Sequence, residues 1–145
     1  MAALESITTP DYAALAEFRY QIRKFLHFSE QQARNAGIEP QQHQLLLAIK
    51  GVVESQQEPS IGILAERLQL QHHSTGELVD RLVERRLVSR SRSPEDRRQV
   101  LIRLTARGEI ELERLSTCHL AELRTTGPAL VAALEGVIRR NCGTD

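Results

Sequence analysis

Aromatic residues are scarce in this sequence: its 145 residues include no Trp, two Tyr and three Phe. A core with so few rings must be filled mainly by Leu, Ile, Val and Ala, and this favours packed helices. The composition is otherwise ordinary, with 41% hydrophobic and 26% charged residues, which is typical of a globular chain and not of a disordered one. The length predicts a single domain that covers residues 1–145.

Long apolar runs are also lacking. No stretch approaches the roughly 18 apolar residues that indicate a membrane-spanning helix. The first residues, MAALESITTPDYAALAE, have neither the basic start nor the apolar middle of a secretory signal. We therefore expect a cytoplasmic protein.

The sequence has few motifs of catalytic or metal sites. The two cysteines, Cys118 and Cys142, fit neither a disulfide framework nor a CxxC metal motif, and we interpret them as incidental small residues, leaving a redox role open. The five histidines show no HxxxH or HExxH pairing. No GxSxG elbow, P-loop or GxGxxG turn is present. We expect no enzyme activity, no cofactor and no bound metal.

The net charge is zero, but the charge is unevenly distributed along the chain. Nine arginines and three acidic residues lie between Arg81 and Arg107, which gives this segment a charge of +6. Because the whole chain sums to zero, the other residues together carry −6. A basic segment is often only a solvated surface, so its meaning depends on the elements that present it.

Apolar residues at spacings of three and four predict long helices on both sides of the chain's centre. One covers residues 11–35 and the next residues 41–53, with Gly37 suited to a left-handed helix end and Pro40 to a first helical turn. Thr105 is placed to cap a further helix. We expect Gly127 and Pro128 to interrupt that helix, with a last one from Ala129 to about Arg140.

The centre of the chain has the pattern of a helix-turn-helix. Residues 63–68 predict a short helix with Gly62 as its N-cap, residues 69–71 a tight break, and STGELVDRLVERRLV a second helix. The runs LVSRSR and QVLIRLT then flank SPEDR, where Pro94 fits the second position of a type I turn, so they predict a β-hairpin. The expected fold is mostly α with a small β-hairpin wing.

A winged helix can contact nucleic acid through two elements, its second helix and its hairpin. Its second helix fits the major groove of DNA, while an arginine at the hairpin tip suits the negative potential of the minor groove. Asp96 lies two residues before Arg98, so its carboxylate is placed to fold back on backbone donors or to brace that arginine. Asp80 would repel phosphate, and we expect it to face away from DNA or to brace a neighbouring arginine.

The most specific stretch is SPEDRRQVLIRLTARG, supported by GIEPQQHQLLLAI and LAERLQLQHHSTGELVDRLVERRLV. At these residues the sequence resembles the MarR family of bacterial transcription regulators. Asp96 and Arg98 occupy the family's Asp-x-Arg positions in the wing, and Leu104, Thr105 and Gly108 the positions that follow. Gln69 and Arg86 stand where the family usually has Gly, so a positive φ there would be strained.

The resemblance implies a homodimer in which helices at about 11–35 and 106–141 interlock, around a winged helix-turn-helix at about 40–105. Wide apolar faces on the terminal helices favour the same assembly, because a monomer would expose them. The dimer would read a pseudo-palindromic operator in double-stranded DNA. Members of this family commonly act as repressors that are released by a small aromatic or phenolic ligand, or by oxidation, so the resemblance implies a ligand-responsive repressor. The residues of a ligand site are not indicated by the sequence.

Carried over residue by residue, the resemblance implies DNA contacts at the start of the second helix, farther along it and on the wing. Arg98 would read the groove after ordering by Asp96, and Arg90, Arg92 and Arg97 would hold phosphates. The remaining implied contacts are Gln71, His72, His73, Ser74, Thr75 and Arg81.

A different class of function stays open at this point. A winged helix can serve as a protein-interaction module, with its basic face on an acidic protein partner. The wing favours DNA, because a protein adaptor does not need an Asp-x-Arg pattern at a hairpin tip.

Overall fold

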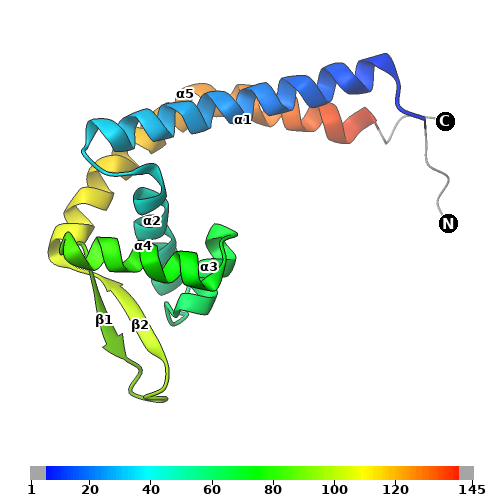
Figure 1. The fold of residues 1–145 in the computed structure, drawn as a ribbon. Coiled ribbons are helices and arrows are strands. Elements are labelled where there is room, and N and C mark those ends of the chain that lie inside the picture. Colours follow the sequence, from blue (N-terminus) through cyan, green and yellow to red (C-terminus); the bar gives the residue numbers. More distant parts are fainter. Residues whose placement is uncertain (1–5, 141–145) are drawn as a thin grey trace. The chain divides into compact units, whose positions relative to one another are not determined.

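The computed structural model describes residues 6–140, which form five helices and one hairpin (Figure 1). The elements are α1 (Thr9–Asn35), α2 (Pro40–Glu54), α3 (Ile61–Leu68), α4 (His72–Glu84), β1 (Val88–Arg92), β2 (Val100–Leu104) and α5 (Ala106–Arg140). The predicted fold class, mostly helical with a small hairpin wing, is confirmed. No helix within residues 6–140 is long and apolar enough to cross a membrane.

The chain divides into two compact units. The winged-helix unit covers residues 32–117, and the terminal-helix unit combines the chain before residue 32 with the chain after residue 117. Helices α1 and α5 each contribute to both units. The predicted helix-turn-helix and hairpin therefore lie together in one unit.

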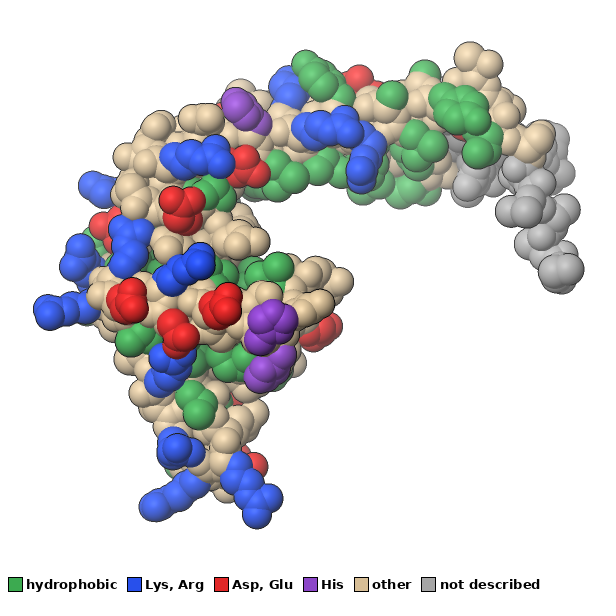
Figure 2. Space-filling model, in the orientation of Figure 1, with side chains coloured by type: hydrophobic (Ala, Val, Ile, Leu, Met, Phe, Trp, Pro, Cys, Tyr) green, Lys and Arg blue, Asp and Glu red, His purple; other side chains and the backbone are tan. Residues whose placement is uncertain are grey.

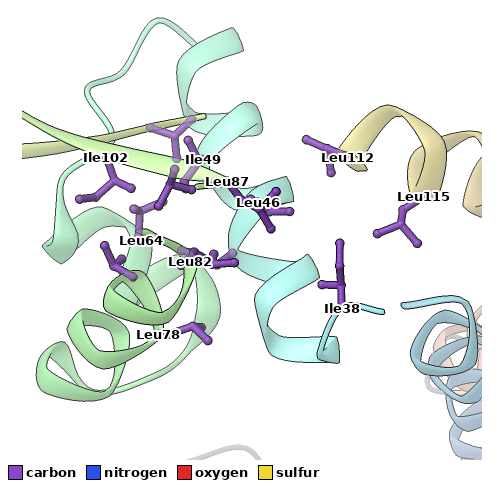
Figure 3. Close-up of a cluster of buried hydrophobic side chains, with 14 residues drawn as sticks. Ile38, Leu46, Ile49, Leu64, Leu78, Leu82, Leu87, Ile102, Leu112 and Leu115 are labelled. Atoms are coloured by element: carbon purple, nitrogen blue, oxygen red, sulfur yellow. The ribbon is translucent and has the colours of Figure 1, made fainter. Parts of the chain in front are cut away.

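The core of the winged-helix unit is aliphatic, as the scarcity of aromatic residues predicts. Side chains from α2, α3, α4, the hairpin and the start of α5 meet there, and Figure 3 shows them pointing toward one another. Its buried members are Ile38, Leu45, Leu46, Ile49, Val52, Leu64, Leu78, Val79, Leu82, Leu87, Val88, Ile102, Leu112 and Leu115. Burial of this apolar surface holds α4 and the hairpin against the same core.

The hairpin pairs β1 with β2 in an antiparallel register, with Val88 opposite Leu104 and Arg92 opposite Val100. A further contact ties the hairpin to the chain before α3, where the backbone N–H of Ile102 donates to the carbonyl oxygen of Pro59 at 2.8 Å. Its base is therefore anchored to the helix-turn-helix, while its tip extends beyond it (Figure 1).

Two predicted helix starts differ from the structure. The N-cap of α3 is Ser60 and not Gly62, because the Ser60 hydroxyl accepts a hydrogen bond from the N–H of Ile63 at 3.4 Å. Glycine has no side chain that could make this bond. Helix α4 begins at His72, two residues earlier than the sequence pattern indicated.

The predicted break at Gly127 and Pro128 is wrong, since α5 continues through both residues. Proline lacks an N–H, so the carbonyl of Arg124, four residues earlier, loses its helical partner. Arg124 and Pro128 are both exposed, and water can satisfy the freed carbonyl. Apolar residues also recur at helical spacing on both sides of the proline, so the packing favours one helix.

A residue in the left-handed conformation follows each of the first four helices, and the one after α2 is Gln56 at φ 61°. Gly37 adopts it at φ 77°, as predicted, and Gln69 and Arg86 adopt it at φ 54° and 60° without the freedom of glycine. After Gln69 and Arg86, the N–H groups of Leu70 and Leu87 each donate at 3.0 Å to a carbonyl five residues back. Leu87 is only 2% exposed, so burial of this leucine helps to hold the strained residue before it.

The terminal-helix unit is built from the α1 and α5 segments. Its buried His119 shares a hydrogen bond of 2.7 Å between Nε2 and the Ser29 hydroxyl, and the rings of Phe25 and Phe28 meet the imidazole edge-on. Many large apolar side chains of these segments remain exposed, namely Tyr12, Leu15, Tyr20, Leu26, Leu120, Val131, Leu134 and Ile138. Cys118 is an exposed free thiol, and Cys142 lies outside the described residues.

Candidate nucleic-acid interface

The start of α4 presents several of the side chains implied as DNA contacts. Gln71 is the N-cap residue, and its side chain makes no capping hydrogen bond. His72 and His73 are exposed in the first turn, and Ser74 is half-buried. Figure 2 shows the histidines at this end of the helix. The first turn therefore offers amide, imidazole and hydroxyl groups to a partner.

Thr75 does not belong to this surface. Its side chain is 0% exposed, and its hydroxyl donates to the carbonyl oxygen of Gln71 at 3.0 Å. It lies on the same side of α4 as Leu78, Val79 and Leu82, which pack into the core. A DNA contact through the Thr75 side chain does not fit this placement, because the helix turns it inward.

The outward face of α4 is mainly acidic. Residues at spacings of four, three and four share one stripe of the helix, and all four are exposed: His73, Glu77, Asp80 and Glu84. Figure 2 shows acidic side chains over this helix. Arg81 is exposed beside the stripe. The predicted reading helix thus combines basic and acidic groups.

An ion pair joins α4 to the first wing strand. The guanidinium of Arg90 on β1 contacts the carboxylate of Asp80 on α4. The side chains remain 39% and 61% exposed respectively. The prediction that Asp80 braces a neighbouring arginine is confirmed, and Arg90 is already partly neutralised.

Ser93 organises the turn at the tip of the wing. It is buried, and its hydroxyl accepts hydrogen bonds from the N–H groups of Glu95 and Asp96 at 3.3 and 3.4 Å. Its own N–H donates to the carbonyl oxygen of Gln99 at 2.9 Å. These bonds order a bend at Pro94 and Glu95, and the turn closed by a backbone bond lies three residues later than predicted, where the N–H of Gln99 donates to the carbonyl oxygen of Asp96 at 3.0 Å.

Asp96 and Arg92 fix the arginines at the tip. The Asp96 carboxylate accepts a hydrogen bond from the backbone N–H of Arg98 at 3.0 Å, as predicted, and Arg92 Nη1 donates to the carbonyl oxygen of Arg97 at 2.8 Å. The guanidinium groups of Arg97 and Arg98 are exposed and make no hydrogen bond or ion pair with the described residues. Figure 2 shows basic side chains gathered at this end of the hairpin.

Arg85 belongs to the basic segment but is held within the winged-helix unit. Its guanidinium donates to the carbonyl oxygen of Gly37 and to Oε1 of Gln42, each at 2.8 Å. These two hydrogen bonds therefore connect the end of α4 to the start of α2 and to the residues just before it. Sequence reasoning had no signal for this role, because Arg85 and Gly37 lie 48 residues apart.

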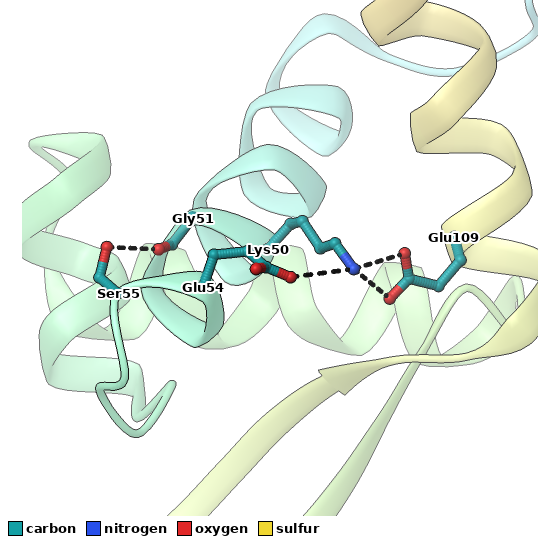
Figure 4. A network of polar contacts seen from close by, with 5 residues as sticks. All are labelled: Lys50, Gly51, Glu54, Ser55 and Glu109. Carbon is teal, nitrogen blue, oxygen red and sulfur yellow. Dashed lines mark hydrogen bonds and ion pairs between the residues drawn. The ribbon is translucent and has the colours of Figure 1, made fainter.

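A second long-range contact ties α2 to the start of α5 (Figure 4). Lys50 Nζ lies 3.1 Å from Oε2 of Glu109 and 3.5 Å from Oε1 of Glu54. The hydrogen bond to Glu109 is the main cause that raises the pKa of Lys50, with a smaller contribution from Glu54. This contact supports α5 where it leaves the hairpin.

Close packing explains one of the glycines in the motif that follows the wing. A Cβ at Gly108 would lie 2.1 Å from the carbonyl oxygen of Leu87. The N–H of Gly108 also donates at 3.1 Å to the hydroxyl of Thr105, which confirms Thr105 as the cap of α5. Only glycine lets the first turn of α5 pack this close to the backbone of Leu87.

No group of three or more His, Cys, Asp or Glu side chains that could hold a metal ion occurs in the described part of the chain. The features that remain are an exposed helix face and an ordered hairpin with unpaired arginines. A helix-turn-helix followed directly by a basic hairpin defines this chain as a winged helix-turn-helix protein.

Residues 36–99 match the model of the MarR family. This segment holds α2, α3, α4 and β1, and over it the match confirms the resemblance noted in the sequence. No curated protein sequence matches the chain.

Solved structures share the fold at low sequence identity. AbsC, a MarR family transcriptional regulator from Streptomyces coelicolor, has a TM-score of 0.71 at 20% identity, over 84% of this chain and 81% of its own. A mutant of S. aureus MepR bound to an oligodeoxyribonucleotide has a TM-score of 0.63 at 20% identity, over 94% of each chain. BpsR of Bordetella bronchiseptica, described with regulation of its DNA binding by 6-hydroxynicotinic acid, has a TM-score of 0.63 at 21% identity, over 88% of this chain and 91% of its own.

Proposed function

We propose that this protein is a MarR-family regulator that binds a specific site in double-stranded DNA as a homodimer and acts as a ligand-responsive repressor. The observation that carries the proposal is the wing tip, where local hydrogen bonds order the backbone while the Arg97 and Arg98 guanidinium groups stay unpaired. Because the backbone at the tip is already ordered, less conformational entropy is lost when these two side chains meet phosphate or a groove.

The first turn of α4 supports the same function. Gln71, His72 and His73 are exposed there and can donate to phosphates or base edges. Of the residues predicted as contacts, Thr75 is left out because its side chain is buried. Arg81, Arg92 and Arg97 remain candidates for phosphate contacts, and Arg90 contributes less because Asp80 is its partner.

The exposed apolar side chains of α1 and α5 support the homodimer. Eight large ones lie on the terminal-helix unit, from Tyr12 to Ile138. A monomer would leave them in water, and a second copy of the chain would cover them. A dimer also presents two winged helices, which suits a pseudo-palindrome with half-sites about one helical turn apart.

Relief of repression by a small aromatic or phenolic ligand is the regulatory part of the proposal. It is supported by the description of BpsR, whose DNA binding is regulated by 6-hydroxynicotinic acid. A thermal-shift screen with phenolic and pyridine carboxylic acids tests it, since a ligand of the folded state raises the melting temperature. The cytoplasmic location and the lack of enzyme activity stay predictions.

The function is tested by selecting duplexes from a randomised DNA library with the full chain. We expect a pseudo-palindromic consensus, and an affinity whose logarithm falls with the logarithm of salt concentration by roughly 0.9 for each neutralised phosphate. Polyglutamate of similar charge is the control. No consensus, together with equal binding to polyglutamate, would instead support an acidic protein partner. Light scattering of the free protein tests the dimer, and a stable monomer would remove the pseudo-palindrome.

A further inference from the structure

Glu77 is an unusual residue for a helix that enters a DNA groove. It lies at the centre of the outward stripe of α4, four residues after His73 and four before Arg81. Its side chain is exposed and makes no hydrogen bond or ion pair with any described residue. The helix thus presents an uncompensated carboxylate at the middle of its predicted reading surface.

The other two acids of the stripe have different surroundings. Asp80 is paired with Arg90 of the wing. Glu84 is the last residue of α4, roughly 10 Å farther along the helix axis than Glu77 at 1.5 Å per residue. Groove-bound reading helices contact bases through their N-terminal residues. Among these three acids, Glu77 is therefore the unpaired one that lies within reach of the bases.

A free carboxylate near phosphates weakens binding unless it accepts a hydrogen bond there. The four bases differ in what they offer in the major groove. Guanine presents two acceptors, thymine an acceptor and a methyl group, and adenine an acceptor next to its amino group. Only cytosine presents an amino donor without an acceptor beside it, so only cytosine suits a carboxylate fully.

We propose that Glu77 is a specificity-determining residue that accepts a hydrogen bond from the 4-amino group of one cytosine in each half-site. The proposal rests on the proposed DNA-binding function and names one base contact within it. A carboxylate at this position lowers the attraction for the phosphates, and it makes the affinity depend on which base it faces. Glu77 would therefore reduce affinity for most sequences and preserve it for those with cytosine at the facing position.

The test compares Glu77→Ala with Glu84→Ala, which removes the same charge from the same stripe nearer the helix end. Each variant and the wild type select duplexes from one randomised library. In the wild type, replacing the selected C·G pair by T·A should weaken binding roughly 5- to 150-fold. In Glu77→Ala the same replacement should change affinity less than twofold. Glu84→Ala should keep the wild-type consensus and penalty.

A second variant covers the case in which Glu77→Ala does not fold. Glutamine both donates and accepts, and it matches the amino group and N7 of adenine. Glu77→Gln should therefore shift the selected base from cytosine toward adenine, while circular dichroism confirms that the helices are intact. If Glu77→Gln still selects cytosine, and replacing that C·G pair by T·A costs as much affinity as in the wild type, the inference is overturned.

The outcomes separate this inference from the function on which it rests. If the wild type selects no consensus, both are overturned. If the wild type selects a site and Glu77→Ala selects it with the same base penalties, Glu77 has no reading role and the DNA-binding function stands. Loss of preference at one position alone, in Glu77→Ala and not in Glu84→Ala, supports the assignment.

Discussion

Asp80 on α4 and Arg90 on β1 form an ion pair, so the two parts of the predicted DNA surface are joined through side chains. Both groups are substantially exposed, and pairs of this kind contribute little to stability. The pair matters more for the charge of the predicted DNA surface than for the stability of the fold. One arginine of the basic segment and one acid of the outward stripe of α4 neutralise each other before any ligand arrives.

The pair makes Arg90 and Arg97 unequal in DNA binding. Arg97 has an unpaired guanidinium, so Arg97→Ala should lower the slope of log affinity against log salt by about 0.9 for each subunit, or about 1.8 for the proposed dimer. Arg90→Ala should change the slope by less than half of that, because Asp80 already balances its charge. Fluorescence anisotropy over a salt series measures both. Equal changes would show that the Asp80 pair opens on binding.

Arg98 should contribute more to affinity for the operator than its neighbours. Arg98→Ala is expected to weaken operator binding by about 1 to 3 kcal/mol at fixed salt, because the ordered backbone at Asp96 presents this guanidinium unpaired. Light scattering should show the oligomeric state unchanged. Arg98→Lys is the control that keeps the charge, and it should recover only the part of the loss that is electrostatic. Unchanged affinity in Arg98→Ala would remove the wing from the interface.

Local patterns explain what could be predicted from the sequence. The left-handed Gly37, the cap at Thr105 and the bend after Ser93 each depend on residues within a few positions, so sequence alone indicated them. The strain at Gln69 and Arg86 was visible for the same reason, since the family pattern has glycine at both. The order of the elements followed from these signals and from apolar spacing.

Long-range contacts explain what could not be predicted. The bonds from Arg85 to Gly37 and from Lys50 to Glu109 join residues 48 and 59 positions apart, and no local pattern marks them. The DNA contact at Thr75 was implied only by the family resemblance, whereas its spacing from Leu78 and Leu82 places it on the buried side of α4. Pro128 indicated a break because proline removes one helical hydrogen bond, but at this exposed position α5 tolerates that loss.

Gly108 and Gly76 should respond in opposite ways to the same substitution. Gly108→Ala places a methyl group against the Leu87 carbonyl oxygen and should destabilise the protein by about 1 to 3 kcal/mol. A Cβ at Gly76 meets nothing within 4 Å, so Gly76→Ala should stabilise α4 by up to about 1 kcal/mol. Urea unfolding of both variants measures the difference. A neutral Gly108→Ala would mean that α5 can shift away from Leu87 at little cost.

Relief of backbone strain should stabilise Arg86→Gly more than Gln69→Gly. Both residues have a positive φ, where glycine avoids a cost of about 1 kcal/mol or more. The Gln69 side chain donates to the carbonyl oxygen of Glu66 at 2.8 Å, and glycine would lose this bond. We expect about 1 kcal/mol for Arg86→Gly and a smaller gain for Gln69→Gly in urea unfolding. Gln56→Gly, at φ 61°, is the matched control, because Gln56 has the same backbone conformation but lies outside the helix-turn-helix and the hairpin.

The contact between Lys50 and Glu109 should appear as a stability difference at alkaline pH. The pKa of Lys50 is raised above its ordinary value of 10.5, chiefly by the hydrogen bond to Glu109, so folding favours the protonated amine. Its contribution is therefore complete below pH 10.5 and is lost as the pH rises through the higher, folded-state value.

The measurement compares the wild type with Glu109→Gln by urea unfolding between pH 8 and the alkaline limit of folding. The stability gap between the two should stay constant up to about pH 10 and then shrink, because deprotonation removes the charge that the Glu109 carboxylate attracts. Lys50→Met should give a chain whose response to Glu109→Gln no longer depends on alkaline pH. A gap that is constant through the whole range would show that the Lys50 amine is equally basic in the folded and unfolded chains.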